Sequence, residues 1–508
     1  MRSLLFLTTL LILPLYHLKA QEITAVVVDA HTRQPIPYAT VQYAANKGVI
    51  TNDEGRFTLQ VQLKDEDSLV ISSMGFETLG FPVKDLKDET VYLKSSNIEL
   101  KDVFLTNKNL KGKEIIEKVK QNVEQNYNFD LTHKRFFFRE SQVNNIKRFD
   151  LLVDKSTFPD LDQALMTGIS QKVPRYSDSY KEVLGDIYGN YDNQKLQVVK
   201  AANLHNPQST TGLTELTDKL ERIFKDNIKS NSFLKIKSGI IGVKVDAEEL
   251  TQEMEEEKEV AKTSVEKTPE QKEKEFAERQ KNLASSTTLK IGKLMKSTFW
   301  NEDITLDVFE KPGRYKFEVE GYAQMDNFIV YVISFTPKWR GDFEGKIYVN
   351  TMDYGVHRLD YHNIKPIKSF KLFGISASED VYRGKMIFSR AEEGQYDPKY
   401  LEFERGDSFG IDRPLTIIEK NKFVKGKRRQ NELDLDIKIN AGDVRKYQLV
   451  VYESSPIGED VFKEFTSTNS FEYETFKVYN SEFWKGYNII EPNAAIKAFT
   501  ALDEDQIY

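Results

Sequence analysis

The second half of the chain repeats one pattern, in which large apolar residues alternate with polar ones over short runs. The runs GRYKFEVEGY, NFIVYVISFTP, DFEGKIYVN and YGVHRLDYHNI follow one another between residues 313 and 364. A period of two is typical of strands with one wet face, and short connections between such strands predict an antiparallel meander. The 32 Phe and 24 Tyr residues favour the same structure, because flat side chains pack well on a pleated surface.

Similar runs continue to the end of the chain, among them KYLEFERGDSF, PLTIIEKNKFV and ELDLDIKINA. We expect a mainly β protein in which residues 105–508 form one large, strongly curved antiparallel sheet, or half-barrel, with helices against its inner side. The run EIIEKVKQNVEQNY predicts one of these helices, since Ile115, Val119, Val123 and Tyr127 form an apolar stripe.

A helical insertion at about 213–290 interrupts the predicted sheet. Leu216, Leu220 and Ile223 lie on one side of a predicted amphipathic helix. The following stretch, 248–284, is almost devoid of large apolar residues and rich in Glu and Lys. Such a segment cannot bury enough surface to fold alone, so we expect a charged helical insertion in contact with water.

Residues 21–104 are expected to form a separate domain. Short alternating strands are separated by turns at Pro35 and Pro37, at Asn52 to Gly55 and at Gly75. Small polar residues and glycine tolerate the backbone angles of tight turns. This arrangement predicts a β-sandwich of the seven-stranded type.

The same region resembles the carboxypeptidase-regulatory-like domain, a transthyretin-like sandwich. The residues that carry the resemblance are Asp29, Pro35, Ala39, Val41, Thr51, Asp53, Gly55, Phe57, Leu69, Gly75 and Phe76. Ala25 departs from the family pattern, which usually has glycine there. The resemblance implies an accessory module without catalytic residues, found beside metallocarboxypeptidases and ahead of the plug of TonB-dependent transporters. It therefore implies no peptidase activity.

The larger region is similar to a family of uncharacterised Gram-negative envelope proteins that carry the same module in front. The matching pieces are EIIEKVKQNVEQNYN with FFFRES, VISFTPKWRGDFEGKIYVNTMDYGVHRLDY, and FWKGYNIIEP. The second piece also resembles half-barrels of the lipoprotein-carrier (LolA-like) type. Those proteins bind acyl chains between a curved sheet and covering helices, so an apolar tunnel between helix 110–127 and the later strands would favour lipid. A filled core would favour a scaffold.

The first twenty residues have the layout of a secretory signal peptide. Arg2 precedes an apolar run from Leu4 to Leu15, and Ala20 is a small residue before the expected cut. We therefore divide the chain into a signal peptide at 1–20, a sandwich at 21–104 and a sheet domain at 105–508. No later segment is apolar for long enough to predict a transmembrane helix.

Composition excludes several chemistries. The chain has no cysteine, so it has no disulfide, thiol nucleophile or lipid-modified N-terminal cysteine. Its net charge of −7 argues against nucleic acid as the main partner.

The residue patterns that resemble catalytic or metal sites have simpler explanations. His357 and His362 would point to opposite faces of a strand, because five residues separate them. Arg405 to Ser408 resembles a hydrolase block, but it ends a polar strand and no histidine follows it. Asp434 and Asp436 are ordinary on a wet strand face. Asn52 to Glu54 could suggest calcium, but such side chains usually cap their own turn.

We expect no catalytic, cofactor-binding or metal-binding residues. Trp300, Trp339 and Trp484 are the candidate binding residues, since exposed aromatic rings contact sugars and proteins, although buried packing is the commoner role.

The predicted function is that of a non-catalytic exported envelope protein. It would bind a lipid or glycan ligand, or a protein partner, through its curved sheet, in the periplasm or peripherally at the outer membrane. Two alternatives stay open: an outer-membrane-associated component of a TonB-dependent uptake system, and a hydrolase.

Overall fold

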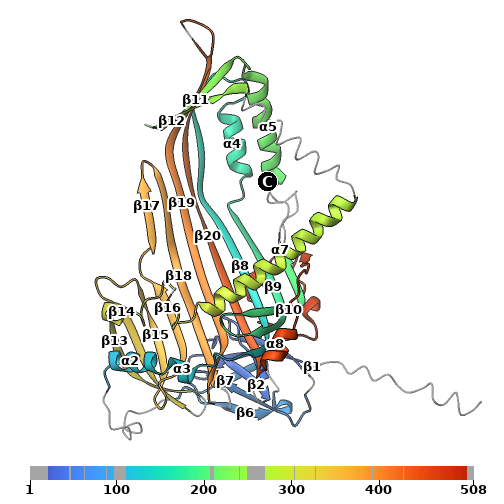
Figure 1. The fold of residues 1–508 in the computed structure, drawn as a ribbon, viewed down its shortest axis with the longest axis vertical. Helices are drawn as coiled ribbons and strands as arrows, with labels where there is room; N and C mark the ends of the chain where they lie inside the picture. The colour runs from blue at the N-terminus through green and yellow to red at the C-terminus, as the bar shows by residue number, and fades with distance from the viewer. Residues whose placement is uncertain are drawn as a thin grey trace, which may run out of the picture. The chain divides into compact units, whose positions relative to one another are not determined.

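The computed structural model divides the chain into two compact units, Met1–Ser95 with Asn480–Asn493 and Ser96–Tyr479 with Ala494–Tyr508 (Figure 1). The residues that it describes are 21–44, 47–61, 63–86, 89–96, 110–205, 211–239, 241–248, 269–302, 304–325, 328–390, 394–426 and 428–499. The predicted signal peptide and residues 249–268 of the predicted charged segment lie outside the described residues.

The first unit is a sandwich of two sheets, with strand orders β4-β1-β7 and β3-β2-β5-β6. The core between the sheets comes from the inward residues of each strand, such as Val27, Val41, Leu59 and Leu69, all fully buried. The predicted seven-stranded sandwich is confirmed. Its elements are β1 (Gln21–Asp29), β2 (Thr40–Ala44), β3 (Lys47–Ile50), β4 (Arg56–Val61), β5 (Ser68–Ser72), β6 (Leu79–Pro82), η2 (Val83–Asp85) and β7 (Thr90–Leu93).

The turn before β4 shows why its polar residues are needed. The Asn52 side-chain oxygen accepts hydrogen bonds from the backbone N–H groups of Glu54 and Arg56, both at 2.9 Å. Gly55 has a φ of 72°, a left-handed conformation that glycine adopts at no steric cost. Asn52 therefore caps its own turn.

A segment near the end of the chain, Asn480–Asn493, belongs to the first unit, although the sequence placed it in the sheet domain. It includes η5 (Ser481–Trp484) and buries Trp484, which is 2% exposed. The Asn488 side-chain oxygen accepts a hydrogen bond from the backbone N–H of Gln60 in β4 at 2.8 Å, and the Gln60 side chain accepts one from Gly486 N–H. The apolar residues of FWKGYNII thus complete the sandwich.

We predict that Trp484→Ala destabilises the first unit by about 3–5 kcal/mol, because it leaves a large cavity. Hydrogen exchange of the Gln60 amide, which donates to Asn488, should accelerate accordingly. The control is Lys485→Ala, an exposed neighbour whose loss should change stability by less than about 0.5 kcal/mol. Equal exchange rates in the two variants would contradict the assignment of this segment to the sandwich.

The second unit is built on a 14-stranded sheet whose main path runs β13-β14-β15-β16-β18-β19-β20-β8-β9-β10-β21. All of these pairs are antiparallel except β10 with β21. The sheet is open, since its path starts at β13 and ends at β21, and Figure 1 shows its long, curved central strands. The strands are β8 (Thr132–Ser156), β9 (Tyr176–Gly189), β10 (Gln194–Leu204), β11 (Ser232–Ser238), β12 (Ile241–Asp246), β13 (Tyr315–Met325), β14 (Phe328–Pro337), β15 (Phe343–Asn350), β16 (Val356–Asn363), β17 (Lys368–Leu372), β18 (Ile375–Arg390), β19 (Tyr396–Asn421), β20 (Arg429–Pro456) and β21 (Glu474–Phe476).

The helices confirm the expected combination of a large antiparallel sheet with helical insertions. They are α2 (Gly112–Gln121), α3 (Val123–Asn126), α4 (Gln163–Lys172), α5 (Thr211–Asn227), α7 (Pro269–Lys296), α8 (Glu459–Glu464) and α9 (Ala494–Lys497), with a 3-10 turn η4 (Pro312–Arg314). Among the described residues, no helix combines the length and the apolar character needed to cross a membrane.

The sequence predicted a helical insertion at 213–290, but the structure shows that this segment also contains strands. Between α5 and α7 the chain forms a hairpin of β11 and β12, and β11 pairs with the upper end of β19 from Ser232↔Asn421 to Lys237↔Thr416. The run SFLKIKS alternates apolar and polar residues, so it extends the sheet where β19 offers an unpaired edge.

The two apolar clusters that pack against α2, α7, α4 and α5 lie on one face of the sheet. The β19–β20 register is unbroken from Tyr400↔Val450 to Ile418↔Glu432, so odd-numbered residues of β20 share a face. Leu449 belongs to the first cluster, which includes Ile115 of α2 and Ile291 of α7. Leu435 belongs to the second cluster, with α4 and α5. We call this side the helix face.

Candidate functional site

Between the two clusters, the helix face carries an apolar area that is partly open to solvent. The strand registers align two neighbouring rows of side chains there, one beside the β17–β18 turn and the other two residues further along the strands. We call these ten residues the mid-sheet patch: Phe370, Ala377, Phe409, Ala441 and Ile146 in one row, and Leu372, Ile375, Ile411, Ile439 and Phe149 in the other.

Exposure of large apolar side chains distinguishes this patch from the clusters beside it. Phe370 is 52% exposed, Leu372 49% and Phe409 45%, whereas Leu449 in the first cluster is fully buried. Single exposed apolar residues are ordinary, but aligned neighbours on several strands form a continuous surface. Packed helices hold the sheet on both sides of the patch, so the surface is presented on a rigid support.

A row of paired charges borders the patch on the side of the first cluster. Glu379, Asp407 and Asp443 are aligned across three strands by the register. The Arg405 guanidinium lies 3.1 Å from Glu379 and 3.2 Å from Asp407, and the Arg445 guanidinium lies 3.1 Å from Asp443. The three carboxylates thus pair with two arginines from the next row, and Arg405 is shared by two of them. The result is an apolar surface with a polar, nearly neutral rim.

The Arg405 to Ser408 block does not end a strand, as the sequence suggested, but lies in the middle of β19. The Ser408 hydroxyl is 2.8 Å from the hydroxyl of Ser378 on β18, its cross-strand neighbour. A catalytic serine of this kind would require a sharp strand-to-helix turn. Here the serine pairs with another serine on a regular ladder.

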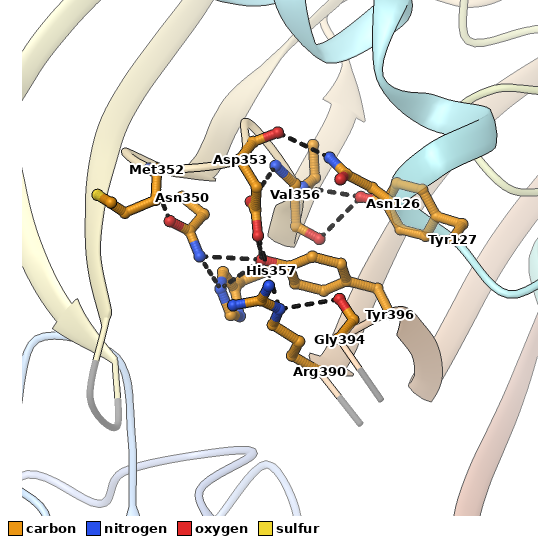
Figure 2. Close-up of polar contacts among 11 residues, drawn as sticks. Asn126, Tyr127, Asn350, Met352, Asp353, Val356, His357, Arg390, Gly394 and Tyr396 are labelled. Carbon is orange, nitrogen blue, oxygen red and sulfur yellow. Dashed lines mark hydrogen bonds and ion pairs between the residues drawn. The ribbon is translucent and has the colours of Figure 1, made fainter. Parts of the chain in front are cut away.

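A buried polar network lies at the turn between β15 and β16 (Figure 2). The Tyr396 hydroxyl is 3.1 Å and 3.2 Å from the two carboxylate oxygens of Asp353, and it accepts a hydrogen bond from the Asn350 amide at 3.0 Å. It also lies 3.2 Å from Nε2 of His357. The network therefore connects the turn to the start of β19.

Two residues at the end of α3 also bond to the β15–β16 turn. The Asn126 side-chain amide donates to the backbone oxygen of Asp353 at 2.8 Å. The Tyr127 hydroxyl donates to the Val356 oxygen at 3.0 Å and accepts from the Val356 N–H at 2.8 Å. Two adjacent residues at the end of α3 thus satisfy three backbone groups of a turn more than 200 residues away.

The chemistry of this network is that of a structural tie. Burial lowers the pKa of His357 to about 4, because desolvation disfavours the charged imidazolium more than Asp353 favours it. Burial, with the Asp353 carboxylate nearby, raises the pKa of the Tyr396 hydroxyl. His357 is therefore neutral and Tyr396 protonated at neutral pH, and both are engaged in holding the turn. His362 is exposed and pairs with Glu344 at 2.9 Å, whereas His357 is buried where the register of β15 and β16 shifts.

We predict that acid destabilises the second unit partly through His357. In the unfolded chain its pKa is near 6.5, and in the folded chain it is about 4, so the unfolded state binds more protons between these pH values. The free energy of unfolding should fall as the pH is lowered through this window, by at most about 3 kcal/mol from this group. His357→Gln should flatten the pH profile, measured by chemical denaturation at pH 7 and pH 4. An unchanged slope would refute the prediction.

The three tryptophans lie in different environments and do not form one site. Trp300 is partly buried against the first cluster, with its ring centroid 4.5 Å from that of Tyr127. Trp484 is buried in the first unit. Trp339 is 80% exposed, and the Arg340 guanidinium lies 3.9 Å from its ring centroid. Of the three, only Trp339 presents a surface ring.

Aromatic rings fill the space between α3, the residues after α7 and the sheet. The rings of Tyr127, Phe299, Trp300 and Phe388 have centroids between 4.5 and 6.1 Å apart. Two open grooves lie beside the helices, and the four rings line neither of them. One, of about 750 Å³, lies along α7 and includes Lys281, Lys293 and Thr288; another, of about 1010 Å³, lies between α4 and α5.

Among the residues that the structure describes, no group of three or more His, Asp or Glu side chains is placed to hold a metal ion. The mid-sheet patch was not recognised from the sequence. Phe370 and Phe409 lie on different strands, and only the register brings them into one row.

Comparisons with known proteins identify one part of the chain. Residues 23–105 match the CarboxypepD_reg-like domain family, which confirms the resemblance of the first unit. Comparison with curated proteins gives no match.

Comparison with solved structures gives two weak matches. A LolA superfamily protein from Nitrosomonas europaea is 9% identical, covering 70% of this chain and 97% of its own, with a TM-score of 0.15. The MucA/MucB complex structure from Pseudomonas aeruginosa gives 6% identity, 68% and 99% coverage and the same TM-score. A TM-score of 0.15 does not establish a shared fold, so no ligand is inferred from either protein.

Proposed function

We propose that this chain is a non-catalytic, exported cell-envelope protein that binds a protein partner through the mid-sheet patch. The observation that carries the proposal is that the half-exposed Phe370, Leu372 and Phe409 side chains lie in two adjacent rows on a supported sheet. Aligned apolar surfaces with a polar rim are typical of interaction sites. The domain match at residues 23–105 supports a place in the envelope, where such modules are common.

A protein partner is favoured over an acyl chain because of the shape of the surface. A lipid carrier needs a concave pocket that encloses most of its ligand. Here the space beneath α7 and α3 is filled by aromatic rings, Trp300 and Phe388 among them, and the patch lies on an open sheet. An extended, exposed apolar surface fits a second protein surface better.

A binding role is favoured over hydrolysis because the side chains capable of catalysis have structural partners. Ser408 bonds with Ser378, while His357 is buried with Tyr396 and Asn350. A nucleophilic serine needs a base within hydrogen-bond reach. The group within reach of the Ser408 hydroxyl is the hydroxyl of Ser378, which is not a base. Turnover of an ester or peptide that disappears in Ser408→Ala would overturn this part of the proposal.

The experiment uses a photo-crosslinking amino acid at single positions of the sheet in intact cells. Position 409 tests the patch, and position 152 is the matched control. Leu152 is 44% exposed, close to the 45% of Phe409, but the register places it on the opposite face, across from Asp436. We expect one discrete protein adduct from position 409 and none of that size from position 152.

Each outcome of this experiment bears on the proposal. A protein adduct from position 409 alone supports it, and identification of that protein as a TonB-dependent transporter would assign the chain to an uptake system. A lipid adduct from position 409 would contradict the preference for a protein partner. Adducts of equal yield from both positions would show that the mid-sheet patch has no special role.

A further inference from the structure

The far end of the second unit carries a basic, aromatic hairpin tip that the binding proposal does not use. The strands β19 and β20 are joined by residues 422–428, and Figure 1 shows this hairpin projecting beyond α5 and β11. Phe423 at the tip is 78% exposed and Val424 is 44% exposed. Two adjacent large apolar side chains therefore extend into solvent at the most distant turn of the sheet from α2.

The tip has a defined conformation. The Asn421 side-chain oxygen accepts hydrogen bonds from the N–H groups of Phe423 at 2.8 Å and Val424 at 3.2 Å. The Arg428 guanidinium donates to the Val424 backbone oxygen at 2.8 Å. Lys422 forms an ion pair of 2.6 Å with Asp246 of β12, which ties the tip to the neighbouring hairpin. The exposed side chains are thus held outward by a built turn.

The charge of the tip is opposite to that of the whole chain. From Lys420 to Gln430 the sequence has six Lys or Arg residues and no Asp or Glu, while the chain has a net charge of −7. The carboxylates that contact the tip are already engaged, Asp246 with Lys422 and Glu432 with Arg429 and Lys155. The exposed positive charges of Lys425 and Arg428 are therefore accessible to an anionic partner.

We propose that this tip binds an anionic lipid bilayer, with Phe423 and Val424 entering the interface and Lys425 and Arg428 contacting the headgroups. Aromatic side chains favour the headgroup region, and each basic residue near an anionic surface adds attraction. Because the rest of the chain is acidic, an anionic bilayer would repel the rest of the chain. The bilayer therefore selects this end, and the sheet stands away from the membrane with the mid-sheet patch accessible.

A bilayer explains more of the tip than an acidic protein or nucleic acid would. Cations alone would serve either of those partners, but the exposed aliphatic Val424 beside Phe423 contributes only where apolar groups leave water. The interaction is independent of the proposed protein partner, because the tip and the mid-sheet patch are separated by some ten residues of β19.

The test measures binding of the purified chain, starting at Gln21 so that the apolar leader is absent, to sedimented vesicles. Vesicles of phosphatidylcholine with phosphatidylglycerol are compared with vesicles of phosphatidylcholine alone. We expect binding to the anionic vesicles only, weakened by added salt. The double variant Phe423→Ser with Val424→Ser should reduce the partition coefficient about tenfold or more, as should Lys425→Glu with Arg428→Glu.

The matched controls lie at an exposed aromatic and arginine pair elsewhere in the same unit. Trp339→Ser and Arg340→Glu remove an 80% exposed ring and a cation next to it, but outside the tip. They should leave vesicle binding unchanged. Equal loss in the tip and control variants, equal binding to neutral vesicles or no vesicle binding at all would overturn the proposal.

A second measurement separates insertion from simple charge attraction. Because the chain has no cysteine, a single cysteine can be placed at position 423 and labelled with an environment-sensitive fluorophore. Insertion predicts a blue shift on addition of anionic vesicles and no shift from a label at position 339. Binding without a shift at position 423 would show that the tip contacts acidic groups only at the surface, and would overturn insertion.

Discussion

The pairing of β19 with β20 is the constraint on which the second unit depends. Its register runs without a bulge from Tyr400↔Val450 to Ile418↔Glu432, so every odd residue of β20 in this span points to one face. The two apolar clusters, with their five covering helices, and the mid-sheet patch therefore share a face. A single residue inserted between Leu435 and Leu449 would place these two side chains on opposite faces of the sheet.

The same pairing allows part of the sheet to exist without a covering layer. Near Asp407 and Asp443 both faces are at least partly exposed, so the strands are stabilised there by the backbone ladder and by charge pairs such as Arg405 with Glu379. An apolar patch in this region carries a risk of aggregation, since exposed apolar surface attracts other chains. Its retention on a rigid support is the physical reason to assign it a binding role.

Local patterns in the sequence were sufficient for the type of many elements, although not for the β11–β12 hairpin, and they did not give the arrangement of the elements. Alternation predicted the strands around Phe317 and Ile333, and the stripe of Ile115 and Val119 predicted α2, because those signals lie within a few residues. The strand partners of β11, the return of Trp484 to the sandwich and the contact of Tyr396 with Asp353 depend on residues far apart in the chain. The mid-sheet patch is a product of register, which no single strand encodes.

The most direct test of the account is the accessibility of single cysteines on the two faces of the central strands, since the chain has none of its own. Phe409→Cys lies in the mid-sheet patch and Leu152→Cys on the opposite face, at nearly equal exposure in the structure. The account predicts similar maleimide labelling of both in the purified protein and selective protection of position 409 in intact cells. Equal labelling of both positions in cells would contradict a partner on the helix face.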